Sequence, residues 1–153
     1  MRTIATPFLV AVFLVISGCA SLMDRASQPD RTYGNIEYEN LYRNFEKVLT
    51  DLGYGVDKRN YSRGYISSTL REYDGEKKGL ATWLEKRKYV AWFDIDRSNP
   101  KRHFLILKVD VKEKAPLSFE WRDKEIERAS DAEYQKILSA LDEIVVENGG
   151  TLQ

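Results

Sequence analysis

The chain has 153 residues, a length that fits one domain with a short additional segment. Its 24 basic and 24 acidic side chains cancel, which argues against a nucleic-acid binder held by phosphate contacts. With 42% hydrophobic residues a packed core is expected. The single cysteine and the single histidine exclude an internal disulfide and any cysteine-rich or multi-histidine metal centre.

The first twenty residues have the features of an export signal. Arg2 supplies a positive start, and residues 8–16 are apolar without a break. A helix that spans a bilayer needs about 20 apolar residues, so this run has the length of a secretory signal and not of a permanent span. The sequence Ile-Ser-Gly-Cys follows at positions 16–19.

This tetrapeptide resembles the lipobox of bacterial lipoprotein precursors, in which the cysteine is acylated and becomes the new N-terminus. The resemblance implies cleavage after residue 18, palmitate and other acyl chains on Cys19, and a domain that faces the periplasm. Ala20 and Ser21 follow the cysteine in place of the Asp that often marks inner-membrane retention, which favours the outer membrane over the inner one. Removing residues 1–18 leaves a net charge of −1, so we expect the lipid, and no basic surface, to hold the chain on the membrane.

The next part of the chain predicts a tether, a helix and a hairpin. Residues 19–35 show no apolar period and are typical of a lipidated N-terminus with a flexible tether. Across residues 38–52, apolar side chains recur at helical spacing, which predicts a core-facing helix that ends before Gly53. Residues 54–58 and 65–71 flank turn-forming residues and predict a β-hairpin.

The middle of the chain predicts further strands. Residues 89–95 and 103–111 alternate apolar and polar side chains, as strands with one buried face do. Residues 117–121 are assigned to an edge strand. Residues 74–79 are expected to form a polar loop, and residues 80–84 a short helix.

The C-terminal part predicts a second helix. A capping box that starts at Ser130 precedes an apolar stripe, which ends before Gly149. The order of helix, strands and helix gives the fold class α+β. We expect an antiparallel sheet with an N-terminal and a C-terminal helix packed on one face, all within a single domain of residues 36–150.

A second resemblance concerns residues 49–56, Leu-Thr-Asp-Leu-Gly-Tyr-Gly-Val, and residues 63–68, Arg-Gly-Tyr-Ile-Ser-Ser. They resemble the opening of small envelope-lipoprotein domains, which include the helix-grip domains of BamC, an accessory lipoprotein of outer-membrane β-barrel assembly. The resemblance implies a helix-grip-like fold. The segment around Trp83 does not belong to the family's pattern.

Residues able to support chemistry are few. Asp94 and Asp96 leave one face of a strand, where two carboxylates could hold a cation or act as acid and base. Pairing with Lys108 across the hairpin is the simpler interpretation. His103 is expected on the surface at a hairpin end, and neither a nucleophile elbow nor a phosphate loop accompanies it. We therefore expect no enzyme activity, no cofactor and no metal.

The strand alternation predicts one candidate interaction surface. If the inward set of side chains meets the helices, the opposite face carries Tyr65, Trp92, Phe104 and Ile106. Four large apolar side chains on a solvent-exposed face of the sheet indicate a partner-binding surface, unless the Trp83 segment or residues 113–128 fold over it.

These features predict a non-catalytic, membrane-anchored lipoprotein of the bacterial envelope. It would be a scaffold or assembly accessory module with an envelope protein as partner. The alternative is a periplasmic module that binds a small ligand, a lipid or a glycan. An enclosed apolar pocket would favour that alternative.

Overall fold

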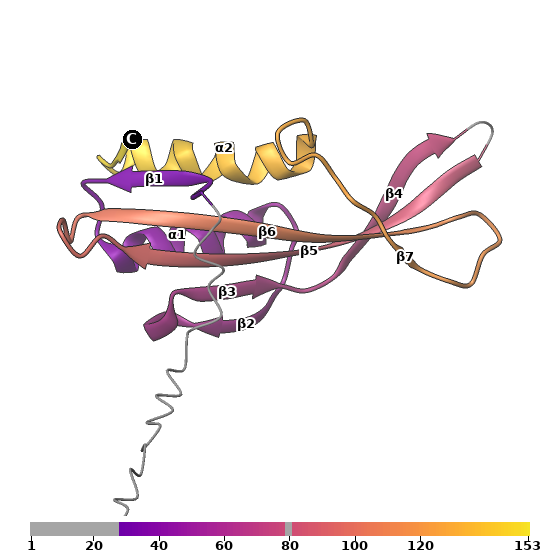
Figure 1. The fold of residues 1–153 in the computed structure, drawn as a ribbon, viewed down its shortest axis with the longest axis horizontal. Helices are drawn as coiled ribbons and strands as arrows, with labels where there is room; N and C mark the ends of the chain where they lie inside the picture. The colour runs from indigo at the N-terminus through magenta and orange to yellow at the C-terminus, as the bar shows by residue number, and fades with distance from the viewer. Residues whose placement is uncertain (1–27, 79–80) are drawn as a thin grey trace, which may run out of the picture.

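The computed structural model describes residues 28–78 and 81–153, which form one antiparallel sheet with two helices on one of its faces (Figure 1). The helices are α1 (Tyr38–Asp51) and α2 (Ala132–Glu147). The strands are β1 (Arg31–Gly34), β2 (Val56–Asn60), β3 (Tyr65–Ser68), β4 (Arg71–Lys78), β5 (Ala81–Ile95), β6 (Arg102–Lys114), β7 (Arg122–Asp123) and β8 (Thr151–Leu152). The predicted α+β class is confirmed.

The sheet runs in the order β2-β3-β5-β6-β1-β8, with β4 added beside β5 and β7 added beside β6. Its centre is the long β5–β6 hairpin, in which Leu84 pairs with Lys114 at one end and Ile95 pairs with His103 at the other. One half of this hairpin lies under the helices. The other half extends beyond them with β4 and β7 and forms an arm (Figure 1).

The core lies between the sheet and both helices. Phe93 of β5 is its clearest marker, because its ring lies 5.8 Å from that of Tyr42 and 5.5 Å from that of Phe45 on α1. The sheet contributes alternate residues, as the sequence predicts for strands with one buried face. The sheet residues in this core include Ile66, Tyr89, Ala91, Phe93, Leu105 and Leu107.

The helix boundaries follow local chemistry. Helix α1 spans the predicted residues, and Gly53 after it has a φ of 81°, a left-handed conformation that favours glycine. Helix α2 has its N-cap at Asp131, whose carboxylate accepts a hydrogen bond of 2.8 Å from the Tyr134 N–H. The predicted cap, Ser130, is therefore one residue too early.

The arm differs from the sequence prediction. The polar loop expected at residues 74–79 and the short helix expected at 80–84 are wrong at every described position, because Arg71–Lys78 and Ala81–Ile95 are paired strands. Residues 79 and 80 of these predictions lie outside the described residues. Charged side chains dominate this pairing, as in the Lys86–Glu72 ion pair of 3.2 Å, so no apolar alternation marks it. The edge strand expected at residues 117–121 is also wrong, since β7 comprises only Arg122–Asp123.

The sheet also includes a strand within the segment interpreted as tether. Strand β1 lies between β6 and β8, and the Tyr33 side chain is fully buried. The Tyr33 hydroxyl donates a hydrogen bond of 2.8 Å to Asp142 of α2, and Arg31 forms an ion pair of 2.9 Å with the same carboxylate. The folded part therefore begins before residue 36 and, through β8, extends past residue 150.

Candidate functional site

The candidate site is the sheet face opposite the helices. In Figure 1, strands β5 and β6 pass in front of α1, so the viewer looks at this face. Tyr65 of β3, Trp92 of β5 and Ile106 of β6 pair across three neighbouring strands. The Tyr65 and Trp92 rings lie 5.7 Å apart, edge to face. All three side chains are partly exposed.

Phe104 extends this row along β6 by one step on the same face, because it lies two residues before Ile106. It is also partly exposed. The structure thus brings together the four residues predicted from the alternation. We call Tyr65, Trp92, Phe104 and Ile106 the aromatic face. Trp83 lies within β5. Residues 123–128 run beside β6 and share a hollow with Ile106 and Lys108, so they border the aromatic face but leave its four side chains partly exposed.

Cationic side chains border the aromatic face. The Lys108 ammonium lies 5.5 Å from the centre of the Trp92 ring, and the Arg102 guanidinium lies 5.4 Å from that of Phe104. Both are cation–π distances. Lys88, on the same face, is instead paired with Asp57 at 2.8 Å, and this hydrogen bond lowers the pKa of the Asp57 carboxyl. The face therefore combines flat aromatic area with positive charge held close to it.

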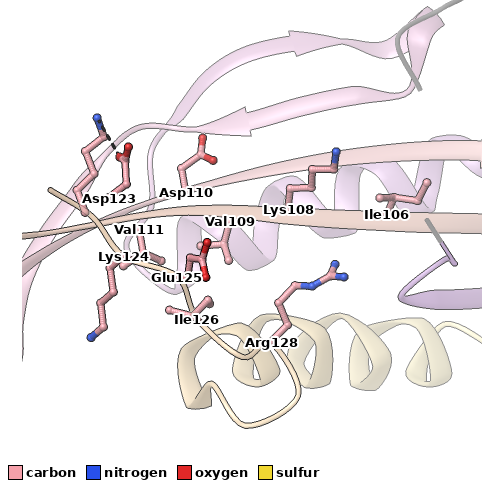
Figure 2. A pocket seen from close by; sticks show the side chains of 11 residues that line it. Ile106, Lys108, Val109, Asp110, Val111, Asp123, Lys124, Glu125, Ile126 and Arg128 are labelled. Carbon is pink, nitrogen blue, oxygen red and sulfur yellow. Dashed lines mark ion pairs between the residues drawn. The ribbon is translucent and has the colours of Figure 1, made fainter. Parts of the chain in front are cut away.

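A hollow opens beside the aromatic face, along the edge of β6 (Figure 2). It measures about 790 Å³ and lies between β6 and the segment 123–128. Charged side chains such as Lys108, Asp110 and Arg128 line it, together with Ile126 and Val111. It is an open hollow lined by charged and apolar side chains together, unlike the enclosed apolar pockets that typically hold small ligands.

A cluster of buried charged side chains lies on the helix side of the sheet, and the sequence pattern did not predict it. Arg87 and Glu85 of β5 are only 6% and 5% exposed, and Arg87 donates to Asp131, the N-cap of α2. Lys124 also lies 3.2 Å from Glu85. Burial alone would raise the pKa of Asp131, but hydrogen bonds from Arg87 and from the Tyr134 N–H outweigh it and keep that pKa below its usual value. The cluster joins the base of the arm to α2, which is a structural role.

The two aspartates singled out from the sequence have structural partners. Asp96 accepts hydrogen bonds from the N–H and the hydroxyl of Ser98, at 2.8 and 2.6 Å, which lower the pKa of its carboxyl. Asp94 accepts from the Ile95 N–H at 2.9 Å. In residues 28–78 and 81–153, no three His, Cys, Asp or Glu side chains are grouped as metal ligands would be.

The expected surface position of His103 is wrong. Its side chain is fully buried, and Nε2 lies 2.8 Å from the Ile36 carbonyl oxygen, which can only accept, so Nε2 donates. Pairing with Ile95 places His103 on the core face of the hairpin, under α1. The strand alternation does place His103 on the core face, in phase with Leu105 and Leu107. The surface prediction followed instead from its polar side chain and its position at the hairpin end.

Cys19 lies outside the described residues. Within them, no helix is long and apolar enough to cross a bilayer. A comparison of the chain with protein-family models and another with curated proteins each found no match.

Proposed function

We propose that this chain is a lipid-anchored lipoprotein of the bacterial envelope. Cys19 would carry the acyl chains on the outer membrane, and the domain would act in the periplasm, without catalysis, as a scaffold or assembly accessory. The lipobox resemblance of residues 16–19 supports the anchor. The net charge of −1 after removal of residues 1–18 supports attachment through lipid and not through a basic surface.

The aromatic face is the observation that supports a protein partner most directly. Tyr65, Trp92 and Ile106 form a row across three hydrogen-bonded strands, which hold the side chains in a fixed arrangement. Tryptophan, tyrosine and arginine are the residues most enriched among those that dominate the binding free energy of protein interfaces. Since Arg102 and Lys108 border the same rings, a partner with acidic side chains around an apolar patch would be complementary.

The shape of the surface favours a protein over a small ligand. A sheet face with partly exposed side chains buries little of a small molecule, whereas it offers a protein a broad contact area. The hollow beside β6 does not change this, because charged side chains line it and it is open.

Site-specific photocross-linking in intact cells tests the proposal. The cross-linking amino acid p-benzoylphenylalanine replaces Phe104 on the aromatic face or, as a matched control, Ser139 on the exposed side of α2. We expect a discrete cross-linked product from position 104 and none from position 139. The product should decrease when Trp92→Ala is added. Equal products from both positions, or one that Trp92→Ala leaves unchanged, would contradict the proposed role of this face.

A further inference from the structure

The loop of residues 115–121 exposes two large apolar side chains at the end of the arm. Leu117 is 101% exposed and Phe119 is 98% exposed, while the other exposed large hydrophobic residues of the described chain reach at most 54%. Figure 1 shows this loop beyond the end of β6, far from the helices along the long axis of the molecule. Single exposed hydrophobic residues are ordinary, but two fully exposed ones in one projecting loop indicate an interaction site.

The loop has local structure that holds these side chains outward. Leu117 has a φ of 65°, a left-handed conformation that leucine rarely adopts. The Ser118 N–H bonds to the Ala115 carbonyl at 3.1 Å, and the Ser118 hydroxyl accepts from the Glu120 N–H at 3.2 Å. Leu117 makes no contact within the described part of its own domain that would explain this strained backbone. A contact with something outside the domain would explain it.

The base of the loop combines an aromatic ring with cations. The Trp121 ring has the Lys86 ammonium 4.1 Å from its centre and the Lys114 ammonium 4.9 Å from it. Tryptophan is enriched at the membrane–water interface, and long lysine side chains there reach toward the headgroups. The order of residues, with Leu117 and Phe119 at the tip and Trp121 with two lysines behind it, matches the change from hydrocarbon to headgroup.

We propose that the loop of residues 115–121 inserts Leu117 and Phe119 into the surface of the phospholipid bilayer that carries the Cys19 anchor. This inference rests on the proposed function, because it needs the domain to be tethered to a membrane. A projecting tip can enter lipid without a complementary pocket. A protein partner would have to supply two such pockets, so the geometry favours the bilayer.

Chain lengths allow the anchor and the loop to meet one membrane surface. The described chain starts beside the middle of β6, where the Asp30 carboxylate accepts from the Leu107 N–H at 2.8 Å. From Leu107 to Ala115 the chain advances about 26 Å, at roughly 3.3 Å per residue. The segment from Cys19 to Gln28 spans at most about 30 Å when fully extended. The anchor and the base of the loop can thus reach one membrane surface when the tether is nearly fully extended.

The anchor also explains why two side chains suffice. Leu117 and Phe119 bury too little apolar area to recruit a protein from solution, just as one short acyl chain gives only reversible binding. Once Cys19 holds the chain, insertion becomes intramolecular, so it needs less apolar area than recruitment from solution does. The loop would therefore orient the domain on the membrane, while the lipid attaches it.

Lipid quenching of a fluorescent label tests the inference with the full-length, lipidated protein in vesicles of phosphatidylethanolamine and phosphatidylglycerol. A nitrobenzoxadiazole label is attached to Glu120→Cys in the loop or, as the matched control, to Arg97→Cys in the turn at the opposite end of the β5–β6 hairpin. The acylated Cys19 thiol does not react with the label. Doxyl-labelled lipids quench only fluorophores that enter the bilayer surface.

We expect at least twofold more quenching at position 120 than at position 97. Adding Leu117→Asn and Phe119→Ser should reduce the quenching at 120 to the control level without changing the melting temperature, because both side chains are fully exposed. If the protein is acylated and the quenching is equal at both positions, the proposed insertion of the loop is wrong, while the proposed anchor stands. A protein partner for the loop would then be favoured. If mass spectrometry detects no acyl groups on Cys19, the proposed anchor is wrong as well.

Discussion

Trp92 and Phe93 are neighbours in β5, and their side chains leave the sheet on opposite faces. Phe93 is 3% exposed and packs against α1, whereas Trp92 is partly exposed with its ring 5.7 Å from that of Tyr65. The same strand thus supplies the core with one aromatic ring and the aromatic face with the next. This relationship makes the two positions a matched pair for experiments.

Replacing these two residues separates stability from binding. Phe93→Ala should lower the free energy of unfolding by about 3–5 kcal/mol, because it removes a buried aromatic side chain. Trp92→Ala should lower it by only about 1 kcal/mol, the value of an aromatic pair such as the one with Tyr65. Urea unfolding of both variants measures the difference. If Trp92→Ala is as destabilising as Phe93→Ala, Trp92 belongs to a second core, and the aromatic face cannot be free for a partner.

The lipid anchor leads to a prediction at Cys19. Cys19→Ala should leave the precursor uncleaved or release the domain from the membrane, since acylation needs the thiol. Cell fractionation and gel mobility measure location and size. A variant of mature size that stays in the outer-membrane pellet would contradict the anchor.

Strand β1 should matter for folding although it lies in the predicted tether. Tyr33→Ala should destabilise the folded domain by about 3–5 kcal/mol, because Tyr33 is fully buried and bonded to α2. Tyr33→Phe keeps the ring and loses only the hydrogen bond to Asp142, so it should cost about 1.5 kcal/mol. Chemical denaturation of both variants provides the measurement. Wild-type stability of Tyr33→Ala would mean that β1 is not part of the cooperative unit.

The ion pair between Arg87 and Asp131 should make stability depend on pH. The pKa of Asp131 is lowered in the folded state, so its charged form stabilises the fold above its unfolded pKa of about 3.9, and this contribution is lost as the pH falls through the folded value. Asp131→Asn retains a capping side chain but lacks the charge. The variant should be less stable than the wild type at pH 7.

The difference should shrink as the pH falls below the unfolded pKa of about 3.9 and through the lower folded value, because the wild-type carboxyl then becomes protonated. Thermal unfolding across this range tests the prediction. Asp96→Asn is the control for a carboxyl whose pKa is lowered mainly by hydrogen bonds from Ser98 and not by a buried guanidinium. A stability difference between wild type and Asp131→Asn that stays constant with pH would show that the charge of Asp131 is not involved.

The sequence predicted best where apolar periodicity was strong. Helix α1, the β5–β6 strands over the core and the opposite orientation of Trp92 and Phe93 all follow from repeated spacing. Each depends on one buried face, which imposes a period that can be read without the structure.

Other parts of the chain carry no such period. Strand β4 pairs through charged side chains, and β1 has only four residues, one of them apolar. Their places in the sheet come from partners distant in sequence. His103 does continue the alternation of Leu105 and Leu107, but the sequence does not show the partner of its ring nitrogen, the Ile36 carbonyl, 67 residues away. The loop at 115–121 resembles a strand in composition, but Leu117 turns the chain out of the sheet.

The way β1 is fastened has a mechanical consequence. Any force that pulls on the segment before residue 28 first reaches Asp30 and Arg31. Asp30 accepts from the Leu107 N–H and pairs with Arg128 at 3.1 Å, while Arg31 is paired with Asp142 of α2. β1 itself lies between two strands and not at an edge. A pulling force on this end is thereby distributed over β6, β8 and α2. If the N-terminal segment is attached to a membrane, the domain should resist unfolding from its N-terminal end.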